Sequence, residues 1–262
     1  MIRNILKISD LNVTFRGASE EFTAVDNFSL EIKKGETIAI VGESGSGKST
    51  TALSILGLLP YPIARHNKGS IKFKNTELLN ADSKKLQKYR GSKIGMIFQE
   101  PMMSLNPLHT VNKQIQESIL IHNKTPLNKL KKRVLELINL VGLNDSEKYL
   151  YSYPHQLSGG QRQRVMIAIA IANNPDLLIA DEPTTALDVT IQIQILQLLK
   201  KIQRKLGMSI LLITHDLGIV KFMAKNVYIM YKAKLVEFGK VKNVLSAPQN
   251  IYTKKLINAQ PI

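Results

Sequence analysis

Residues 38–49 read Ile-Ala-Ile-Val-Gly-Glu-Ser-Gly-Ser-Gly-Lys-Ser. The first four are apolar without interruption, which is typical of a strand buried on both faces of a parallel sheet. The remainder follows the pattern glycine, four residues, Gly-Lys-Ser, in which a curled backbone points its N–H groups at phosphate oxygens. A helical pattern follows at residues 50–58. We therefore predict a strand, a phosphate-binding loop and a helix in succession, which is a unit of an α/β fold.

The loop carries the chemistry of a nucleotide site. The ammonium group of Lys48 can bridge the β- and γ-phosphates, and the hydroxyl of Ser49 can ligate Mg²⁺. The helix that begins near Lys48 directs its N-terminus at the same anion. The predicted nucleotide-binding residues are Gly42, Glu43, Ser44, Gly45, Ser46, Gly47, Lys48, Ser49 and Thr50.

The rest of the chain extends this α/β prediction. Residues 177–180 and 210–213 are further short apolar runs, each followed by polar residues and a helical pattern. Partial alternation at residues 7–15, 23–32 and 69–74 predicts an N-terminal antiparallel β-layer instead. No repeat or low-complexity linker interrupts the sequence, so we expect one compact domain.

Strand signals are missing between about residues 100 and 160, where the spacing of apolar residues is helical. Residues 110–122 and 126–141 are the two clearest segments. We expect Thr125 to cap the second of them and Pro126 to occupy its first helical position. This part of the chain is predicted to be a helical insert.

A pair of acids follows the apolar run at residues 177–180. Asp181 could hold the hydration shell of Mg²⁺, and Glu182 could orient or deprotonate an attacking water. Adjacent acids after a strand are usually plain surface residues. A phosphate-binding loop upstream makes the functional interpretation the better one.

The family is indicated by Leu157-Ser158-Gly159-Gly160-Gln161, which resembles the signature motif of ABC ATPases. The other motifs of that family appear in the order in which the family has them, and the resemblance covers essentially the whole chain. Gln99 after Ile97-Phe98 resembles the Q-loop glutamine, Ala186-Leu187-Asp188 the D-loop, and His215 after Ile213-Thr214 the switch histidine. Phe15 stands where the family places an aromatic ring against adenine.

The resemblance implies a P-loop NTPase (RecA-like) core with an N-terminal antiparallel β-layer and an inserted helical subdomain. The single nucleotide-binding domain would span residues 1–262. Its β-layer and core would comprise residues 1–99 and 173–262, and its helical subdomain about residues 100–172, ending in the signature helix.

The resemblance also implies a mechanism with ATP and Mg²⁺. Two such domains would pack head to tail, with each ATP held between the phosphate loop of one and the signature of the other. Glu182 would be the general base, His215 would contact the γ-phosphate, and Lys48 would bind phosphate. Gln99 would sense Mg²⁺, which Ser49 and Asp181 would also help to hold, and Asp188 would support the contact between the domains. The signature residues Ser158, Gly159, Gly160 and Gln161 would face the partner's nucleotide.

Finer details resemble the oligopeptide, dipeptide and nickel importer branch, among them residues 98–107 and Tyr252-Thr253. In relatives the segment after the Q-loop receives the permease, so residues 101–111 are the expected docking surface. Many peptide importers of this branch continue with a cysteine cluster. The sequence printed here ends at Ile262 without one, which resembles nickel or metal–metallophore importers, and the cargo stays open between these and short peptides.

The expected partners are membrane permease subunits, an extracellular substrate-binding protein and a second ATPase subunit, with a heterodimer favoured over a homodimer. We expect a peripheral protein on the cytoplasmic face of the cell membrane, because neither a signal peptide nor an apolar run of the ~20 residues that span a bilayer is recognisable. The absence of cysteine excludes disulfides, thiolate metal sites and cysteine nucleophiles.

The net charge of +16 raises the question of nucleic acid. Lysines outnumber arginines and are scattered, whereas base recognition favours arginine-rich patches. We therefore expect no nucleic-acid partner, while attraction to an anionic membrane surface stays open. An ABC ATPase of DNA repair or translation is the alternative. It would need a long coiled-coil or zinc-bearing insert, or a second cassette, and the sequence contains neither.

Overall fold

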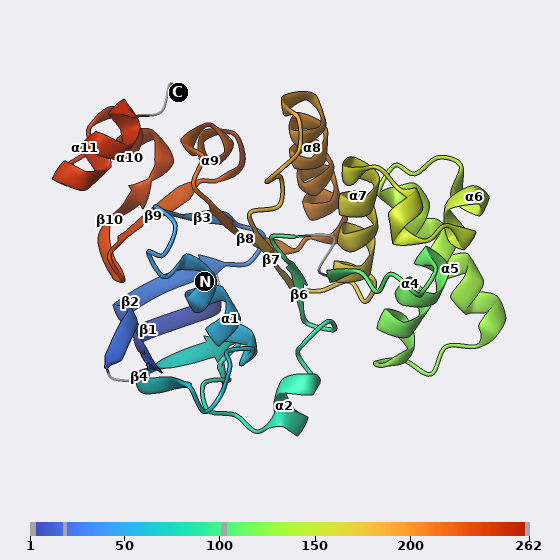
Figure 1. The fold of residues 1–262 in the computed structure, drawn as a ribbon, viewed down its shortest axis with the longest axis horizontal. Helices are drawn as coiled ribbons and strands as arrows, with labels where there is room; N and C mark the ends of the chain where they lie inside the picture. The colour runs from blue at the N-terminus through green and yellow to red at the C-terminus, as the bar shows by residue number, and fades with distance from the viewer. Residues whose placement is uncertain (1–3, 18–19, 101–103, 260–262) are drawn as a thin grey trace. The chain divides into compact units, whose positions relative to one another are not determined.

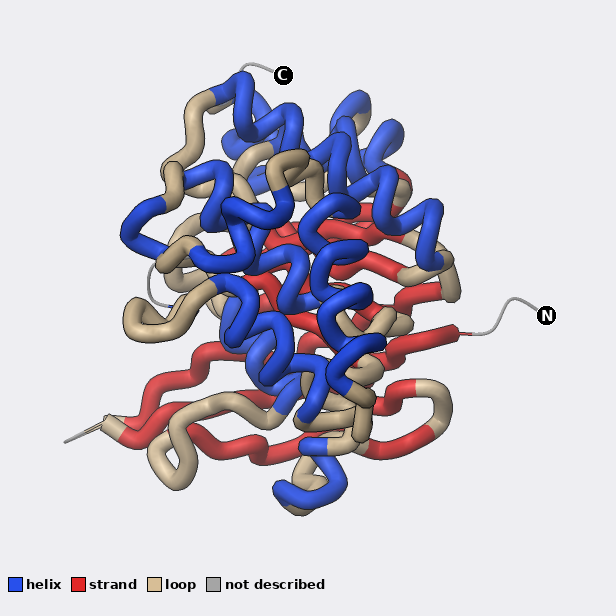
Figure 2. Tube along the Cα trace, turned by 90° about the vertical axis from the view of Figure 1, so that its right-hand side faces the viewer, coloured by secondary structure: helices blue, strands red, loops and turns tan. Residues whose placement is uncertain are grey.

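The computed structural model describes residues 4–17, 20–100 and 104–259. The chain forms two compact units (Figure 1). The first unit comprises Met1–Gln87 and Ser209–Ile262, and the second comprises Lys88–Met208. Figure 2 draws the helices in blue and the strands in red.

The first unit contains the predicted antiparallel layer. Strand β1 (Asn4–Arg16) pairs antiparallel with both β2 (Glu21–Lys33) and β4 (Ala64–Phe73), and β4 pairs with the short β5 (Thr76–Glu77). One face of this layer carries fully buried side chains such as Phe28. Burying a side chain of this size stabilises the fold by about 1.5–3 kcal/mol.

A second group of strands completes the sheet of the first unit. Strand β3 (Thr37–Val41) lies between β8 (Ser209–Thr214) and β9 (Asn226–Tyr231) and is parallel to both. Strand β10 (Lys234–Lys240) is antiparallel to β9. Every residue of β3 and β8 is buried, as their continuous apolar sequences predict. The strand order within the unit is β5-β4-β1-β2-β10-β9-β3-β8.

The helices of the first unit are short. They are α1 (Lys48–Leu56), α2 (Ser83–Gln87), α9 (Leu217–Met223), α10 (Val241–Ser246) and α11 (Ile251–Asn258). Helix α1 ends where Gly57 adopts a left-handed conformation, with φ 59°, and its N–H bonds the carbonyls of Leu53 and Ser54. Glycine adopts this conformation at little cost, so the position of Gly57 fixes the end of the helix.

The second unit is mostly helical. Its strands β6 (Ile94–Ile97) and β7 (Leu177–Asp181) are parallel. Its helices are α4 (Val111–Leu120), α5 (Leu127–Leu140), α6 (Ser146–Tyr151), the 3₁₀ turn η1 (Pro154–Gln156), α7 (Gly159–Ala170) and α8 (Val189–Leu206). Among the described residues, no helix has the length and apolarity that a membrane crossing requires.

The start of α5 differs from the sequence-based prediction by one residue. Pro126 is the N-cap, with an extended ψ of 147°, and the helix begins at Leu127. The sequence pattern predicts Pro126 in the first turn and Thr125 at the cap. A proline ring fixes φ near −65° but leaves ψ free, so proline fits the cap position as well as the first turn. Where the helical subdomain begins and ends in the sequence stays a prediction.

Candidate functional site

The phosphate loop, residues 42–49, connects β3 to α1, and two of its glycines are required by close packing. A Cβ atom on Gly42 would lie 2.2 Å from the carbonyl oxygen of Met230, on the adjacent strand β9. A Cβ atom on Gly47 would lie 2.3 Å from the carbonyl oxygen of Ala24, and Gly47 has a φ of +101°. Only glycine avoids these contacts, so the loop lies directly against the backbone of its neighbours.

Lys48 is the cation of this loop. Its side chain is buried, and its Nζ donates hydrogen bonds to the carbonyl oxygens of Gly42 (2.8 Å) and Glu43 (2.7 Å). The ammonium group is therefore held within the curl of the loop, where phosphate oxygens would bind. Ser49 and Thr50 are half-buried in the first turn of α1. The remaining predicted residues of the loop are exposed Glu43, Ser44 and Gly45 and buried Ser46.

Tyr252 of α11 supports the loop, a role that the sequence analysis did not assign. Its hydroxyl accepts a hydrogen bond from the backbone N–H of Glu43 (3.2 Å), although the two residues are 209 positions apart. Its ring stacks on Tyr231 with centroids 4.1 Å apart. Burial raises the pKa of the Tyr252 phenol, with a smaller contribution from the charge of Glu43, so the neutral hydroxyl is retained. From sequence, Tyr252-Thr253 indicates only a resemblance to the importer branch.

His215 lies at the same sheet edge as the phosphate loop. It follows β8, whose last residue Thr214 pairs with Val41, the residue before the loop. The ring is exposed, and the next residue, Asp216, caps α9 by accepting the backbone N–H groups of Gly218 (2.7 Å) and Ile219 (3.1 Å). The carboxyl ends of neighbouring parallel strands therefore place the histidine and the loop side by side, as α/β folds place ligand-binding groups.

The second unit brings Gln99 and Glu182 together from positions 83 residues apart. Asp181 is the buried last residue of β7, and Glu182 follows it. The Oε2 atom of Glu182 accepts hydrogen bonds from Gln99 Nε2 (3.2 Å) and from the hydroxyl of Thr185 (2.8 Å). Glu182 has a φ of +46°, a left-handed conformation that is uncommon for glutamate. Thr185 was not predicted, because a threonine in a turn carries no signal of its own.

The signature residues form the capped start of α7. The Ser158 hydroxyl accepts the backbone N–H of Gln161 (3.4 Å), and the side-chain Oε1 of Gln161 accepts the backbone N–H of Ser158 (2.9 Å). This reciprocal capping box satisfies two of the free N–H groups at the helix start. The N–H groups of Gly159 and Gly160 lie in the same first turn, where the helix dipole favours an anion. The start of α7 is therefore a second helix end whose geometry could bind an anion.

Helix α7 is also tied to the loop that contains Glu182. The buried side chain of Gln163 donates to the carbonyl oxygen of Pro183 at 2.5 Å. Asp188, predicted to support a contact between domains, caps α8 by accepting the N–H of Ile191 (2.9 Å). The sequence analysis did not predict Gln163, although a glutamine on the otherwise apolar buried face of a helix is a recognisable signal.

The metal donors predicted from sequence are Ser49, Gln99 and Asp181. Hydroxyl, amide and carboxylate oxygens are the donors that Mg²⁺ prefers, and Asp181 is buried at a strand end, so the residues fit this cation. Within the described ranges no group of three or more histidine, aspartate or glutamate side chains could hold a metal by itself. Phe15, the predicted adenine contact, is half-buried on β1, paired with Phe22 and Ala64.

Comparison with known proteins agrees with the family that the sequence motifs indicate. The family described as "ABC transporter" matches residues 25–185. The peptidoglycan transport ATP-binding protein YejF of Agrobacterium fabrum is 53% identical over 98% of the chain, and the chain spans about half (47%) of its length. The dipeptide transport ATP-binding protein DppD of Bacillus subtilis is 48% identical over 99% of the chain and 78% of its own length.

A solved structure agrees with the fold. The dimeric ATP-binding cassette MJ0796, in a post-hydrolysis state bound to ADP and Pi, superposes with a TM-score of 0.80 at 33% identity, covering 90% of this chain and 98% of its own. The predicted fold class is therefore confirmed.

Proposed function

Because the chain belongs to the ABC transporter family, we propose that it is the ATP-hydrolysing subunit of a peptide importer. The observation that carries the catalytic part of this proposal is the Glu182 carboxylate, which Gln99 and Thr185 hold directly after the buried Asp181. A fixed carboxylate beside an amide is the arrangement that an attacking water requires.

ATP binds first at the phosphate loop. The backbone N–H groups of the loop and the N-terminus of α1 surround the phosphates, and Lys48 exchanges its two carbonyl acceptors for phosphate oxygens. Phe15 stacks on the adenine. Ser49, Asp181 and Gln99 are the residues that would hold Mg²⁺, and the ion would supply positive charge that neutralises the phosphates.

Hydrolysis follows in a head-to-tail pair of ATPase subunits. The helix end at Gly159 and Gly160 binds the γ-phosphate of the nucleotide on the partner, and Asp188 supports the contact. Glu182 orients the water and takes its proton, while His215 donates a hydrogen bond to the γ-phosphate. Loss of the γ-phosphate removes the bridge between the subunits, so the pair separates. A heterodimer with a second ATPase subunit remains the favoured form.

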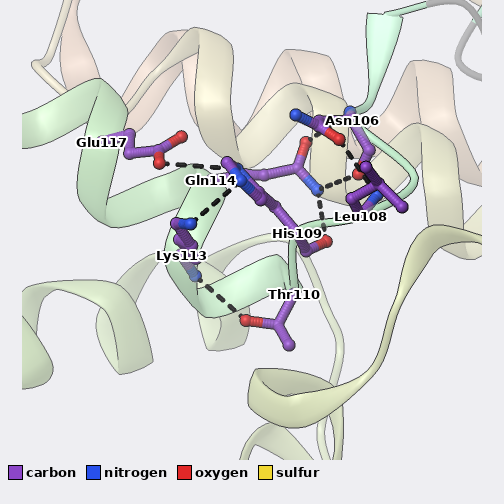
Figure 3. A network of polar contacts seen from close by, with 7 residues as sticks. All are labelled: Asn106, Leu108, His109, Thr110, Lys113, Gln114 and Glu117. Atoms are coloured by element: carbon purple, nitrogen blue, oxygen red, sulfur yellow. Dashed lines mark hydrogen bonds and ion pairs between the residues drawn. The ribbon is translucent and has the colours of Figure 1, made fainter.

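The permease docks on the segment that precedes α4. Of the predicted docking residues 101–111, residues 101–103 lie outside the described part of the chain. Among the others, Asn106 and His109 are held by the network in Figure 3. At its centre the side-chain amide of Gln114 accepts the N–H of Asn106 (2.9 Å) and donates to the carbonyls of Asn106 (3.1 Å) and His109 (2.9 Å). Leu108 is 81% exposed between these anchors. A rigid loop with an exposed apolar tip is suited to receive a helix from another subunit.

The proposal for the cargo is supported by the names of the relatives. Proteins named for dipeptide, oligopeptide and peptidoglycan transport share 47–53% identity with nearly the whole chain. Short peptides are therefore the proposed cargo. A permease and an external substrate-binding protein complete the importer, and the subunit works peripherally on the cytoplasmic face of the membrane. The nickel or metal–metallophore form stays a prediction without a supporting relative among these.

The first test replaces Glu182 with glutamine. The variant keeps the shape of the side chain but loses the base, so we expect ATP binding to persist and turnover to fall by about 10²–10⁴-fold. Phosphate release and binding of a fluorescent ATP analogue measure the two properties. Rapid hydrolysis by Glu182→Gln would remove Glu182 from its role.

The second test separates the cargo from the chemistry. Uptake of a labelled dipeptide and of labelled nickel is compared in cells that carry the natural chain or Lys48→Ala. Loss of dipeptide uptake alone supports the proposal, and loss of nickel uptake alone assigns the metal branch instead. If neither uptake changes while the purified protein hydrolyses ATP, the ATPase assignment holds and the assignment to this branch is wrong.

A further inference from the structure

A hollow of about 640 Å³ lies on the first unit, between α9, the end of β10 and α10. Its residues take no part in the ATPase site described above. Small-molecule sites in proteins usually measure about 300–1,000 Å³, so the hollow has the size of a ligand site.

Half of the residues that line the hollow are lysines, namely Lys221, Lys225, Lys240 and Lys242. All four are exposed, and none forms a salt bridge with a residue in the described part of the chain. No acidic residue lines the hollow. Four ammonium groups around one concavity repel one another, and a multiply charged anion would relieve that repulsion.

The floor of the hollow is different in character. Val241 is buried, Ala224 and Leu245 are half-buried, and Ser246 contributes a hydroxyl. An apolar floor beneath a cationic rim suits a ligand with a compact apolar body and several negative charges. Lysine binds phosphate as a point charge without the planar geometry that arginine requires.

We propose that this hollow, which we call the lysine hollow, binds a phosphate-bearing polyanion. The same chemistry is offered by a soluble phosphorylated metabolite and by the head group of an anionic phospholipid. Helix α9 connects the site to the ATPase, because it begins two residues after His215 and ends beside Lys225. An occupant that bridges Lys221 and Lys225 to Lys240 and Lys242 restrains α9, the helix that follows the switch histidine.

The test compares two variants of equal charge. One changes the four lysines of the hollow to serine. The control changes four other exposed lysines to serine, namely Lys84, Lys88, Lys131 and Lys132. Thermal melting and basal ATPase activity establish that both variants fold. Binding of inorganic tripolyphosphate is measured by calorimetry with ADP filling the phosphate loop, and binding to vesicles is measured by co-sedimentation, with and without phosphatidic acid.

Tripolyphosphate binding that weakens roughly tenfold or more in the hollow variant alone supports the proposal with a soluble ligand, because each lost ammonium removes a charge contact. The same loss in binding to phosphatidic acid vesicles supports it with a lipid ligand. Equal weakening in both variants, or no binding by the natural chain, overturns the proposal. Binding of polyglutamate at the hollow without binding of either phosphate probe also overturns it, in favour of an acidic protein partner.

Discussion

Two side chains hold the carboxylate of Glu182, and the shorter hydrogen bond comes from Thr185. Thr185 itself is exposed and lies three residues beyond the base. Its hydroxyl can fix the orientation of the carboxylate without touching the nucleotide. In the proposed mechanism it is a positioning residue, because it acts through Glu182.

Thr185→Val removes the hydroxyl and keeps the shape of the side chain. We expect kcat to fall by roughly tenfold with little change in KM, since a misplaced base affects the transition state more than ATP binding. Thr190→Val is the matched control, because Thr190 is also exposed and its side chain has no hydrogen bond to Glu182. Steady-state ATPase kinetics of the two variants provide the test. Equal kcat values would contradict the proposal that Thr185 positions the carboxylate of Glu182.

At the scale of elements, the site depends on helices that carry its supports. Helix α11 brings Tyr252 to the phosphate loop, and α7 brings Gln163 to the carbonyl of Pro183 beside the base. Helix α11 is anchored in turn by Glu237 of β10. The Glu237 carboxylate accepts the backbone N–H groups of Gln249 (2.9 Å) and Asn250 (3.0 Å), at the start of the helix.

The anchor of α11 should be sensitive to acid. Burial by itself raises the pKa of Glu237. The hydrogen bonds from Gln249, Thr253 and Asn250, together with the charge of Lys254, outweigh that effect, so the pKa lies below its ordinary value. The carboxylate therefore stabilises the folded state fully above the unfolded-state pKa, near 4.3, and this contribution is lost as the pH falls through the lower folded-state pKa.

The corresponding measurement is the melting temperature of the natural chain and of Glu237→Gln at several pH values. We expect the natural chain to melt higher at pH 7 and the difference to shrink below about pH 4, as the carboxylate becomes protonated. A difference that stays constant down to pH 3 would show that Glu237 does not act through its charge.

The hydrogen bond from Gln163 of α7 to the carbonyl of Pro183, in the loop that contains Glu182, leads to a further prediction. Gln163→Leu leaves the buried carbonyl of Pro183 without its donor, which costs about 1–3 kcal/mol of stability. We expect kcat to fall as well, because the loop that bears the base loses a fixed point. Gln197→Leu, at an exposed position on α8, is the control. A variant that loses stability but keeps the kcat of the natural chain would limit Gln163 to a structural role.

Local pattern predicted the elements and the motifs that lie within one segment. The continuous apolar runs gave β3, β7 and β8, and the serine and glycines at residues 158–160 gave a capped helix start. Tyr252, Thr185 and Gln163 were not predicted as site residues. Their roles arise from partners that the fold brings close, as with Tyr252 and Glu43, and no local periodicity encodes such pairs. The cap of α5 was misplaced by one residue because proline suits both positions.

At the scale of the whole molecule, the proposed mechanism needs two anion-binding helix ends, one at α1 and one at α7. In that mechanism a single chain would use the first for its own ATP and would offer the second to a partner. The dimeric cassette to which this fold is similar was solved with ADP and Pi. Because the two helix ends would serve different nucleotides, the role of the α7 end can be tested separately from ATP binding at α1.

Gly159→Asp tests this division in the Glu182→Gln background, where ATP persists. A Cβ atom on Gly159 meets only Leu187 at 3.4 Å, and an acid in the first helical turn suits the helix dipole, so the fold should tolerate it. Its charge would oppose the partner's γ-phosphate. We expect ATP binding to persist and ATP-induced dimerisation to weaken by roughly a hundredfold.

The neutral variant Gly159→Asn is the matched control, because it has nearly the same shape without the charge. Light scattering after gel filtration, with and without ATP, reports the association state. If the aspartate and asparagine variants dimerise equally, the helix end of α7 does not face the nucleotide of the partner.

The left-handed backbone of Glu182 has a consequence for laboratory evolution of this protein. Such a conformation costs an ordinary L-residue about 1–2 kcal/mol, whereas glycine adopts it freely and asparagine more readily than most residues. A library selected for heat resistance alone would therefore accumulate substitutions at the very position that the proposed chemistry needs. Selection for thermal stability favours replacing Glu182, whereas selection for activity favours keeping it. Each round of selection for stability therefore has to be followed by a screen for ATPase activity.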